Sequence, residues 1–392
     1  MNVRRGWGLI AVVITALAGV APLQPATASV GSVSAQATKW RDLGTLGGDA
    51  SFGVAINALG QVAGTAETAD GSSHAFRWTA SGGMQDLGTL RGVETFARAI
   101  NVLGQVMGVS HPTPDDESDP DNATRGFRWT ASGGMQDLGT LGGCCTFPRG
   151  INDRGQIVGY SLLRNGDTHA FRWTATGGIQ DLGSLGGYIS AATGINALGQ
   201  ITGDADTADL SSHAFRWTPS GGMRDLGTLS GRYSSGDAIN ALGQVVGRHL
   251  NAEGSFQAFR WTASGGMQDL GAFYPTGINA LAQVIGYGNV GNGKSSHGFR
   301  WTSATGLQDL GTLGGKSSLA MGINDLGQIA GTAETSVALE WHAFRWTPST
   351  GMRDLGVPGA SSGASAINIR GQITGSFIPA DGRSNHAFLW TP

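Results

Sequence analysis

Short stretches in which hydrophobic and polar residues alternate run through the chain from residue 40 to its end, separated by glycine-rich turns. In HAFRWT, at residues 74–79, the alternation places His, Phe and Trp on one face of a strand and Ala, Arg and Thr on the other. The segments GIN, GQVVG, HAFRWT and MQDLG follow one another in this order, and each has the length and bounding turns of one strand. Glycine, which accounts for 66 of the 392 residues, disfavours long helices. The pattern therefore predicts an all-β protein.

One unit is repeated eight times along the chain, at intervals of 40 to 51 residues. Four short strands in a unit of this length are typical of a propeller blade. The aspartate of Asp-Leu-Gly recurs at Asp42, Asp86, Asp137, Asp181, Asp225, Asp269, Asp309 and Asp354. The asparagine after isoleucine recurs at Asn57, Asn101, Asn152, Asn196, Asn240, Asn279, Asn324 and Asn368. The tryptophan of the third segment recurs at Trp78, Trp129, Trp173, Trp217, Trp261, Trp301, Trp346 and Trp390.

The two ends of the repeat complete one another. Residues 40–44 form a lone fourth segment, and residues 386–391 form a third segment with no Asp-Leu-Gly after it. Pairing of these two segments would leave no open sheet edge, which protects against edge-to-edge aggregation. We therefore predict an eight-bladed β-propeller of four-stranded antiparallel blades. Its ring is closed by residues 40–44 pairing with the C-terminal blade, and it forms a single domain over residues 40–392.

The first 28 residues have the composition of a signal peptide. Arg4 and Arg5 precede an apolar run over residues 9–21, and the small residues Ala26-Thr27-Ala28 follow it. The apolar run is too short for a membrane span, and no later stretch approaches the necessary length. Residues 29–39 are then a short linker. These features predict a secreted protein, extracellular or at the cell surface; general secretion and twin-arginine export both remain open.

The charge pattern excludes one class of partner. The chain carries 25 basic and 28 acidic side chains, and no basic stripe runs along it. A nucleic-acid ligand needs such a stripe to neutralise its phosphates, so none is expected. The closed repeat is interpreted as a monomer.

Three motifs resemble a known repeat family. HAFRWT, AINALGQVVG at residues 238–247 and DLGTLGG recur in order over residues 40–392. In this they resemble the bacterial extracellular repeat family that is named for His-Ala-Phe. The resemblance implies a secreted or surface-exposed bacterial protein, and it implies no reaction, ligand or catalytic residue. Departures at residues 125–127 and 257–259, which lack the histidine, argue against a role for eight identical histidines.

None of the recurring motifs is that of a known enzyme class. The sequence has no HExxH and no EF-hand. The six histidines that share one repeat position are interpreted as packing residues rather than a metal ring, and the eight tryptophans as core anchors. The repeated aspartates are expected to accept backbone N–H groups in the turn that follows them. No catalytic residue is assigned.

Because a residue that occurs eight times serves the blade, an asymmetric site should lie in the units that differ. The longest interval contains an insert over residues 110–125. We interpret this insert as a solvated loop, with a calcium site as the alternative, since its acids lack a defined ligand spacing. No other cofactor is expected. The acidic residues of the insert are Asp115, Asp116, Glu117, Asp119 and Asp121.

Two other irregular connections carry candidate residues. Cys144 and Cys145 are adjacent, which strains a disulfide, whereas export favours oxidation; a vicinal disulfide and free thiols are both retained. Phe273 and Tyr274 lie in the shortened connection before Asn279, and Trp341 lies before the seventh third segment. These three aromatic residues are interpreted as caps of their loops or as contacts for a carbohydrate.

The function predicted from the sequence is that of a secreted, non-enzymatic binding or surface-interaction propeller. Its partner is expected to be a polysaccharide or a surface protein. Two alternatives remain: a polysaccharide hydrolase or lyase with carboxylates in or near the channel, and a structural envelope protein.

Overall fold

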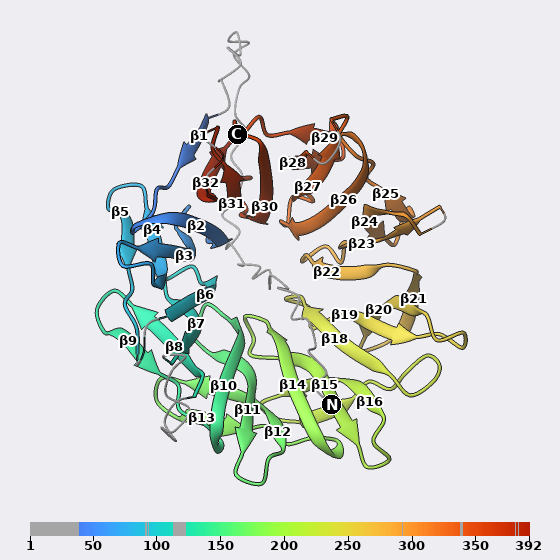
Figure 1. Ribbon diagram of the computed structural model, residues 1–392. Helices are drawn as coiled ribbons and strands as arrows, with labels where there is room; N and C mark the ends of the chain where they lie inside the picture. The colour runs from blue at the N-terminus through green and yellow to red at the C-terminus, as the bar shows by residue number, and fades with distance from the viewer. Residues whose placement is uncertain are drawn as a thin grey trace, which may run out of the picture.

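The computed structural model describes residues 39–392 except 91, 93, 113–122, 292, 338, 339, 381 and 383. Within these residues the strands form seven antiparallel sheets, six of four strands and one of eight. The eight-stranded sheet consists of two four-stranded units that are joined by one parallel pairing, between Thr168 and Ile189. The predicted all-β architecture of four-stranded antiparallel sheets is confirmed. The sheets stand side by side around a common centre (Figure 1).

Every unit has the same strand order, and the first strand lies nearest the centre (Figure 1). The first strands are β2 (Gly47–Ile56), β6 (Glu94–Ile100), β10 (Gly142–Ile151), β14 (Gly186–Ile195), β18 (Ser234–Ile239), β22 (Tyr274–Ile278), β26 (Gly314–Ile323) and β30 (Ser361–Ile367). The second strands are β3 (Val62–Thr68), β7 (Val106–His111), β11 (Ile157–Leu163), β15 (Ile201–Thr207), β19 (Val245–Leu250), β23 (Val284–Val290), β27 (Ile329–Thr335) and β31 (Ile373–Ile378).

The third and fourth strands complete each unit on the outside. The third strands are β4 (Ser73–Thr79), β8 (Arg125–Thr130), β12 (Thr168–Thr174), β16 (Ser212–Thr218), β20 (Phe256–Thr262), β24 (Ser295–Thr302), β28 (Trp341–Thr347) and β32 (His386–Thr391). The fourth strands are β5 (Gly83–Asp86), β9 (Gly134–Asp137), β13 (Gly178–Asp181), β17 (Gly222–Asp225), β21 (Gly266–Gly271), β25 (Gly306–Asp309), β29 (Gly351–Asp354) and, from the other end of the chain, β1 (Lys39–Asp42).

The strand β1 occupies the fourth position of the last unit. It pairs antiparallel with β32, from Lys39 opposite Thr391 to Asp42 opposite Phe388. The outer edge of β32 is therefore covered by a strand from the opposite end of the sequence.

The repeated asparagines link each unit to the next at the hairpin between the first and second strands. The side chain of Asn57 accepts the N–H groups of Leu59 and Gln61, which stabilises the turn. Its Nδ2 donates to Gln61 Oε1 and to the main-chain oxygen of Asn101 in the next unit. Each of the eight asparagines donates to the following one in this way, and Asn368 donates back to Asn57.

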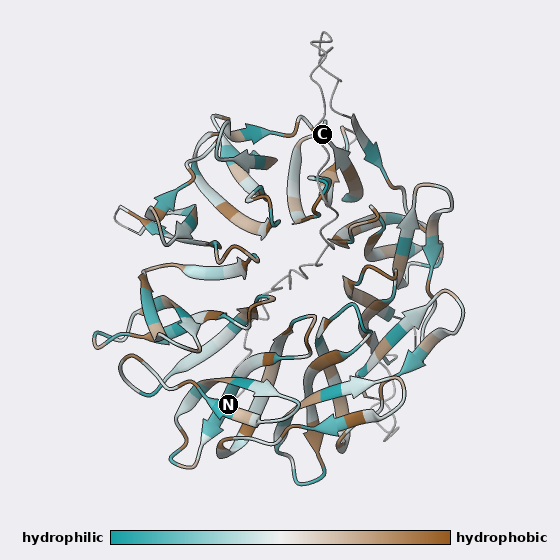
Figure 2. Ribbon diagram, turned by 180° about the vertical axis from the view of Figure 1, so that it is seen from behind, coloured by the Kyte–Doolittle hydropathy of each residue, from teal (hydrophilic) through white to brown (hydrophobic). Residues whose placement is uncertain are grey.

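Hydrophobic packing lies between neighbouring units rather than in one central core. Hydrophobic residues occur in all the sheets (Figure 2). Ala63 and Leu87 of one unit, for example, pack with Val106, Phe127 and Trp129 of the next. The eight repeated tryptophans are at most 6% exposed, so they are core residues.

In seven of the eight units an arginine of the third strand lies over the tryptophan of the next unit, as Arg77 does over Trp129 at 4.8 Å. The last third strand has Leu389 in place of this arginine. Arg41 of β1 lies over Trp78 instead, at 5.6 Å, and supplies the missing cation–π contact.

The aspartate of Asp-Leu-Gly has two roles. In all eight units it accepts the N–H group of the glycine two residues later, at 2.7–2.8 Å, which confirms the predicted turn. In six units it also bonds the histidine of the third strand, as Asp86 does with His74 Nδ1 at 2.9 Å. These histidines are therefore fixed by a carboxylate of their own unit.

None of the described residues forms a helix long and apolar enough to cross a membrane.

Candidate functional site

The three aromatic residues that the sequence singled out do not share one exposed surface. Phe273 is 1% exposed and packs with Phe299, with 6.3 Å between the ring centroids. It cannot stack on a ligand, and this corrects the hypothesis that it contacts one. It occupies the position where other units place a buried Ser or Thr, so the shortened connection directs its side chain into the core.

Tyr274 and Trp341 remain partly exposed, in different sheets. Tyr274 stacks on Tyr287 of the paired strand, with 5.7 Å between the ring centroids. The ring centroid of Phe256 lies 5.9 Å from that of Tyr274. Trp341 begins β28, and its main-chain oxygen accepts a hydrogen bond from Ser361. Their role in binding remains a prediction.

The acidic residues of the insert lie outside the described residues. They are Asp115, Asp116, Glu117, Asp119 and Asp121. Among the residues that are described, no group of three His, Cys, Asp or Glu side chains is placed to hold a metal ion.

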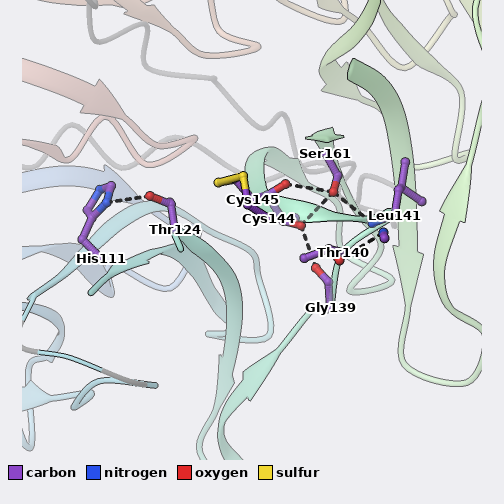
Figure 3. The surroundings of a disulfide bond; sticks show 10 residues. His111, Thr124, Gly139, Thr140, Leu141, Cys144, Cys145 and Ser161 are labelled. Carbon is purple, nitrogen blue, oxygen red and sulfur yellow. Dashed lines mark hydrogen bonds between the residues drawn. A yellow bond between two sulfur atoms is a disulfide. The ribbon is translucent and has the colours of Figure 1, made fainter. Parts of the chain in front are cut away.

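Cys144 and Cys145 form a vicinal disulfide near the start of β10. Cys144 is exposed, and Cys145 is followed directly by the buried Thr146. Ser161 of β11 donates a hydrogen bond to the main-chain oxygen of Cys145 at 2.9 Å. Figure 3 shows the disulfide between Ser161 on one side and Thr124 on the other.

A cavity of about 360 Å³ lies between two neighbouring units, one of which carries this disulfide. Arg98 of β6 and His111 of β7 line one wall, and Phe147 and Arg149 of β10 and Tyr160 of β11 line the other. All five side chains are partly exposed, so the cavity is open to solvent. Binding sites for small ligands have volumes of about 300–1,000 Å³ and a few polar groups on an apolar lining, and this cavity fits that description.

The charged groups of the cavity are cationic. Among the described residues, neither Arg98 nor Arg149 has an ion pair with a carboxylate. Burial, and then repulsion by Arg149, lowers the pKa of Arg98, although an arginine stays protonated at neutral pH. Burial also lowers the pKa of His111, and the nearby Glu94 opposes this effect. At neutral pH the described residues of the cavity therefore present two guanidinium groups that no described carboxylate pairs with.

An aromatic pair forms the second wall. Phe147 and Tyr160 stack with 5.0 Å between their ring centroids and an angle of 24° between their planes. The guanidinium carbon of Arg149 lies 5.4 Å from the centroid of Tyr160. Stacking on both partners restricts the rotamers of these side chains, so the wall is preorganised for a ligand.

Hydrogen bonds connect the cavity to the disulfide. His111 Nδ1 bonds Thr124 Oγ1 at 2.9 Å, and the main-chain oxygen of Thr124 accepts from Thr146 N at 3.0 Å. Thr146 stands between Cys145 and Phe147 in the sequence. The base of the insert and the paired cysteines are therefore linked to lining residues of the cavity through Thr124 and Thr146.

One position in the first strands distinguishes the two units that form the cavity. Arg98 and Arg149 occupy the position two residues before isoleucine in the first strand, where the other units have Val54, Thr193, Asp237, Thr276, Met321 and Ser365. In two of those units the residue reaches the next first strand, as Thr193 Oγ1 does when it donates to Gly236 O. The residue type at this position, which forms one column of the aligned repeats, therefore varies from unit to unit, and the position faces the neighbouring unit. Residues that occur in one or two units only, such as the arginines of the cavity, are found there.

A second group of charged residues surrounds Asp237, which occupies the same column in its own unit. Arg248 donates two hydrogen bonds to Asp237, at 2.9 and 3.1 Å. Asp204 of the preceding unit accepts a bond from Ser235 at 3.3 Å. Burial, and then the neighbouring Asp237 carboxylate, raises the pKa of Asp204 to about 6.

No known protein family matches the chain, and no curated protein matches its sequence. Solved structures do match. The β-propeller domain of the trilobed protease from Pyrococcus furiosus is 10% identical, with a TM-score of 0.51 over 76% of this chain and 93% of that one. Dipeptidyl peptidase 4 from Porphyromonas gingivalis is 8% identical, with a TM-score of 0.57 over 86% of this chain and 56% of that one.

A puromycin hydrolase is 13% identical, with a TM-score of 0.51 over 87% of this chain and 58% of that chain. The chain thus spans little more than half the length of the hydrolase and of the dipeptidyl peptidase. At these identities the likeness shows the fold alone. The fold is that of a β-propeller.

Proposed function

We propose that the chain is a closed eight-bladed propeller, exported as a carbohydrate-binding module that does not turn over its ligand. The pairing of β1 with β32 and the return of the asparagine ladder from Asn368 to Asn57 support closure. The basic start, apolar run and small-residue exit of the first 28 residues support export. The resemblance of the repeats to the His-Ala-Phe family supports an extracellular or cell-surface location.

The observation that carries the binding proposal is the stacked pair Phe147 and Tyr160 in the wall of the cavity. The hydrogens on the flat face of a pyranose ring carry small positive charges, and the face of an aromatic ring is negative. A sugar ring therefore packs favourably on such a wall, and its hydroxyl groups reach the polar side chains around it. A polysaccharide is the proposed partner, and the module acts as a monomer without a cofactor.

The proposal is tested by retention of the mature chain, residues 29–392, on insoluble cell-wall and exopolysaccharide preparations. The Phe147→Ala/Tyr160→Ala variant should lose retention. Tyr188→Ala is the matched control, because Tyr188 is 63% exposed on β14 and does not line the cavity. Equal retention of both variants, or no retention of the unaltered chain, would contradict carbohydrate binding at this cavity. The second outcome is the one that a structural envelope protein predicts.

The carboxyl groups of Asp204 and Asp237 favour a polysaccharide hydrolase as the second candidate. Burial raises the pKa of both carboxyl groups, to about 6 for Asp204, and Arg248 opposes this rise chiefly at Asp237, to which it donates hydrogen bonds. Two carboxyl groups whose environments differ in this way are the acid and base of many glycosidases. New reducing ends in the supernatant, abolished by Asp204→Asn, would support the hydrolase. Polysaccharide bound without release would exclude it.

A further inference from the structure

We propose that the sugar bound in the cavity carries an anionic group, which Arg98 and Arg149 hold. This inference rests on the proposed carbohydrate binding and names the class of sugar. The ligand is a pyranose ring with a carboxylate or a sulfate ester, as in an acidic polysaccharide. The ring lies on the Phe147–Tyr160 wall, and the anionic group enters between the two guanidiniums.

The charges of the cavity favour an anionic ligand. Arg98 and Arg149 line one cavity, repel one another and have no carboxylate partner among the described residues. Partial burial removes some of the water that would otherwise stabilise Arg98. An anion between the two groups relieves both effects, and it is attracted more strongly than in open solvent because the local dielectric constant is lower. The cavity is therefore complementary to a negative charge.

The contrast with the other units is the second argument. Where the same column carries Asp237, Arg248 of the same unit compensates its charge through two hydrogen bonds. Within the described residues, a buried charge is thus compensated by a neighbouring side chain at one position of the column, whereas two arginines have no carboxylate partner at another. Arginine binds carboxylates and other oxyanions through paired N–H groups, so these two side chains suit such a ligand.

The position of Arg149 is the third argument. Its guanidinium lies over Tyr160, 5.4 Å from the ring centroid, and Tyr160 stacks on Phe147. The positive group and the flat apolar wall are therefore parts of one assembly. A ligand that fills both places must carry its charge beside a ring, and acidic sugars have this shape.

Matched pairs of ligands test the inference with the mature chain. Polygalacturonate and its methyl ester have the same rings, and only the former carries the charge; dextran sulfate and dextran form the second pair. Binding is measured by calorimetric titration. We expect the charged member of at least one pair to bind about tenfold more tightly or better, since hydrogen bonds to a charged group contribute that much. Added salt should reduce this preference.

Variants separate the charge from the stacking. Arg98→Gln/Arg149→Gln should abolish the preference and retain the weaker binding of the neutral polymer. Arg370→Gln, which alters an exposed arginine at the β30–β31 hairpin, is the control and should change neither. Circular dichroism and the melting temperature establish that each variant is folded.

The outcomes distinguish this inference from the proposed function. If neutral and charged polymers bind equally and Phe147→Ala/Tyr160→Ala abolishes both, carbohydrate binding stands and the preference for anions is wrong. If the charged preference survives Arg98→Gln/Arg149→Gln, the assignment to this arginine pair is wrong. If no polymer binds, both proposals fail.

Discussion

Asn368 Nδ2 donates a hydrogen bond to the main-chain oxygen of Asn57 at 2.9 Å, although 311 residues separate the two in the sequence. The same contact joins each unit to the next with a length of 2.9–3.1 Å. The contact between the first and last units therefore has the same geometry as the contacts between units that follow one another in the chain. This equivalence is the strongest support for a closed ring.

Replacing Asn368 by alanine should destabilise the protein by about 1–3 kcal/mol, because its buried partners lose their hydrogen bonds. The partners are Asn57 O, Gln372 Oε1 and two N–H groups of its own hairpin. The free energy of unfolding is measured by denaturant titration.

Asn196→Ala provides the matched control, since Asn196 makes the same contacts in the middle of the chain. A closed ring predicts similar losses for the two variants. A much smaller loss for Asn368→Ala would mean that the first and last units are not joined in solution.

Ala282→Gly should stabilise the protein by about 1 kcal/mol. Ala282 has a φ of 60° at the hairpin position where other units have glycine, such as Gly60 at 81°. An L-residue in the left-handed region costs about 1–2 kcal/mol, which glycine does not incur. Gly83→Ala is the reverse control, because Gly83 has a φ of 67° and open space around its Cα. No gain for Ala282→Gly in thermal unfolding would contradict the assigned hairpin geometry.

The stability of the protein should fall as the pH drops through about 6.5, in part because of His111. Burial lowers the pKa of His111 in the folded chain, so the unfolded chain takes up the proton at a higher pH than the folded one does. His111→Gln should reduce this pH dependence in denaturant titrations between about pH 7.5 and 5. An unchanged pH dependence would show that His111 is not perturbed.

Bound anions should reverse the preference of His111 for its neutral form. A negative charge beside the imidazole favours its protonated form, so an acidic polysaccharide should bind more tightly as the pH falls through this range. The effect should disappear in His111→Gln. Tighter binding at higher pH would contradict the placement of the anion in this cavity.

The effect of Asp204 on stability should depend on pH in the opposite sense to that of His111. Its pKa is raised from 3.8 to about 6, so the folded chain holds a proton that the unfolded chain loses between these values. Stability therefore falls as the pH rises from about 4 to 6, by up to about 3 kcal/mol at roughly 1.4 kcal/mol per pKa unit. Asp204→Asn should remove this loss.

Asp70→Asn is a control of the opposite sign. Hydrogen bonds from Thr68 and Ser72 lower the pKa of Asp70, so its contribution to stability is lost as the pH falls. If Asp204→Asn left the slope between pH 4 and 6 unchanged, Asp204 would not be the buried proton acceptor that the structure indicates.

Much of the fold follows from local pattern. The turn at Asp86 and the hairpin at Asn57 depend on contacts within a few residues, and the sequence predicts both. Phe273 was interpreted wrongly because a shortened connection, not the residue type, decides whether its side chain enters the core. The sequence gives no warning of this, since Tyr274 beside it stays partly exposed.

The candidate site depends on contacts between units, which the pattern of one unit does not reveal. Arg98 and Tyr160 belong to different units, and only the packing of β6 against β10 and β11 brings them to one cavity. The sequence predicts that the histidines are packed, but their aspartate partner on the neighbouring fourth strand, such as Asp86 for His74, is evident only from the pairing of third and fourth strands. Repetition identifies the scaffold, and the departures from repetition identify the site.

The central claim is that an acidic sugar binds between Arg98, Arg149 and the Phe147–Tyr160 wall. The most direct test is a crystal structure of the mature chain soaked with a short galacturonate oligomer. We expect the bound oligomer to place a pyranose ring on Phe147 and Tyr160, with its carboxylate within hydrogen-bond distance of Arg98 and Arg149. An oligomer bound elsewhere on the molecule, or a cavity left empty at a concentration that saturates binding in solution, would contradict it.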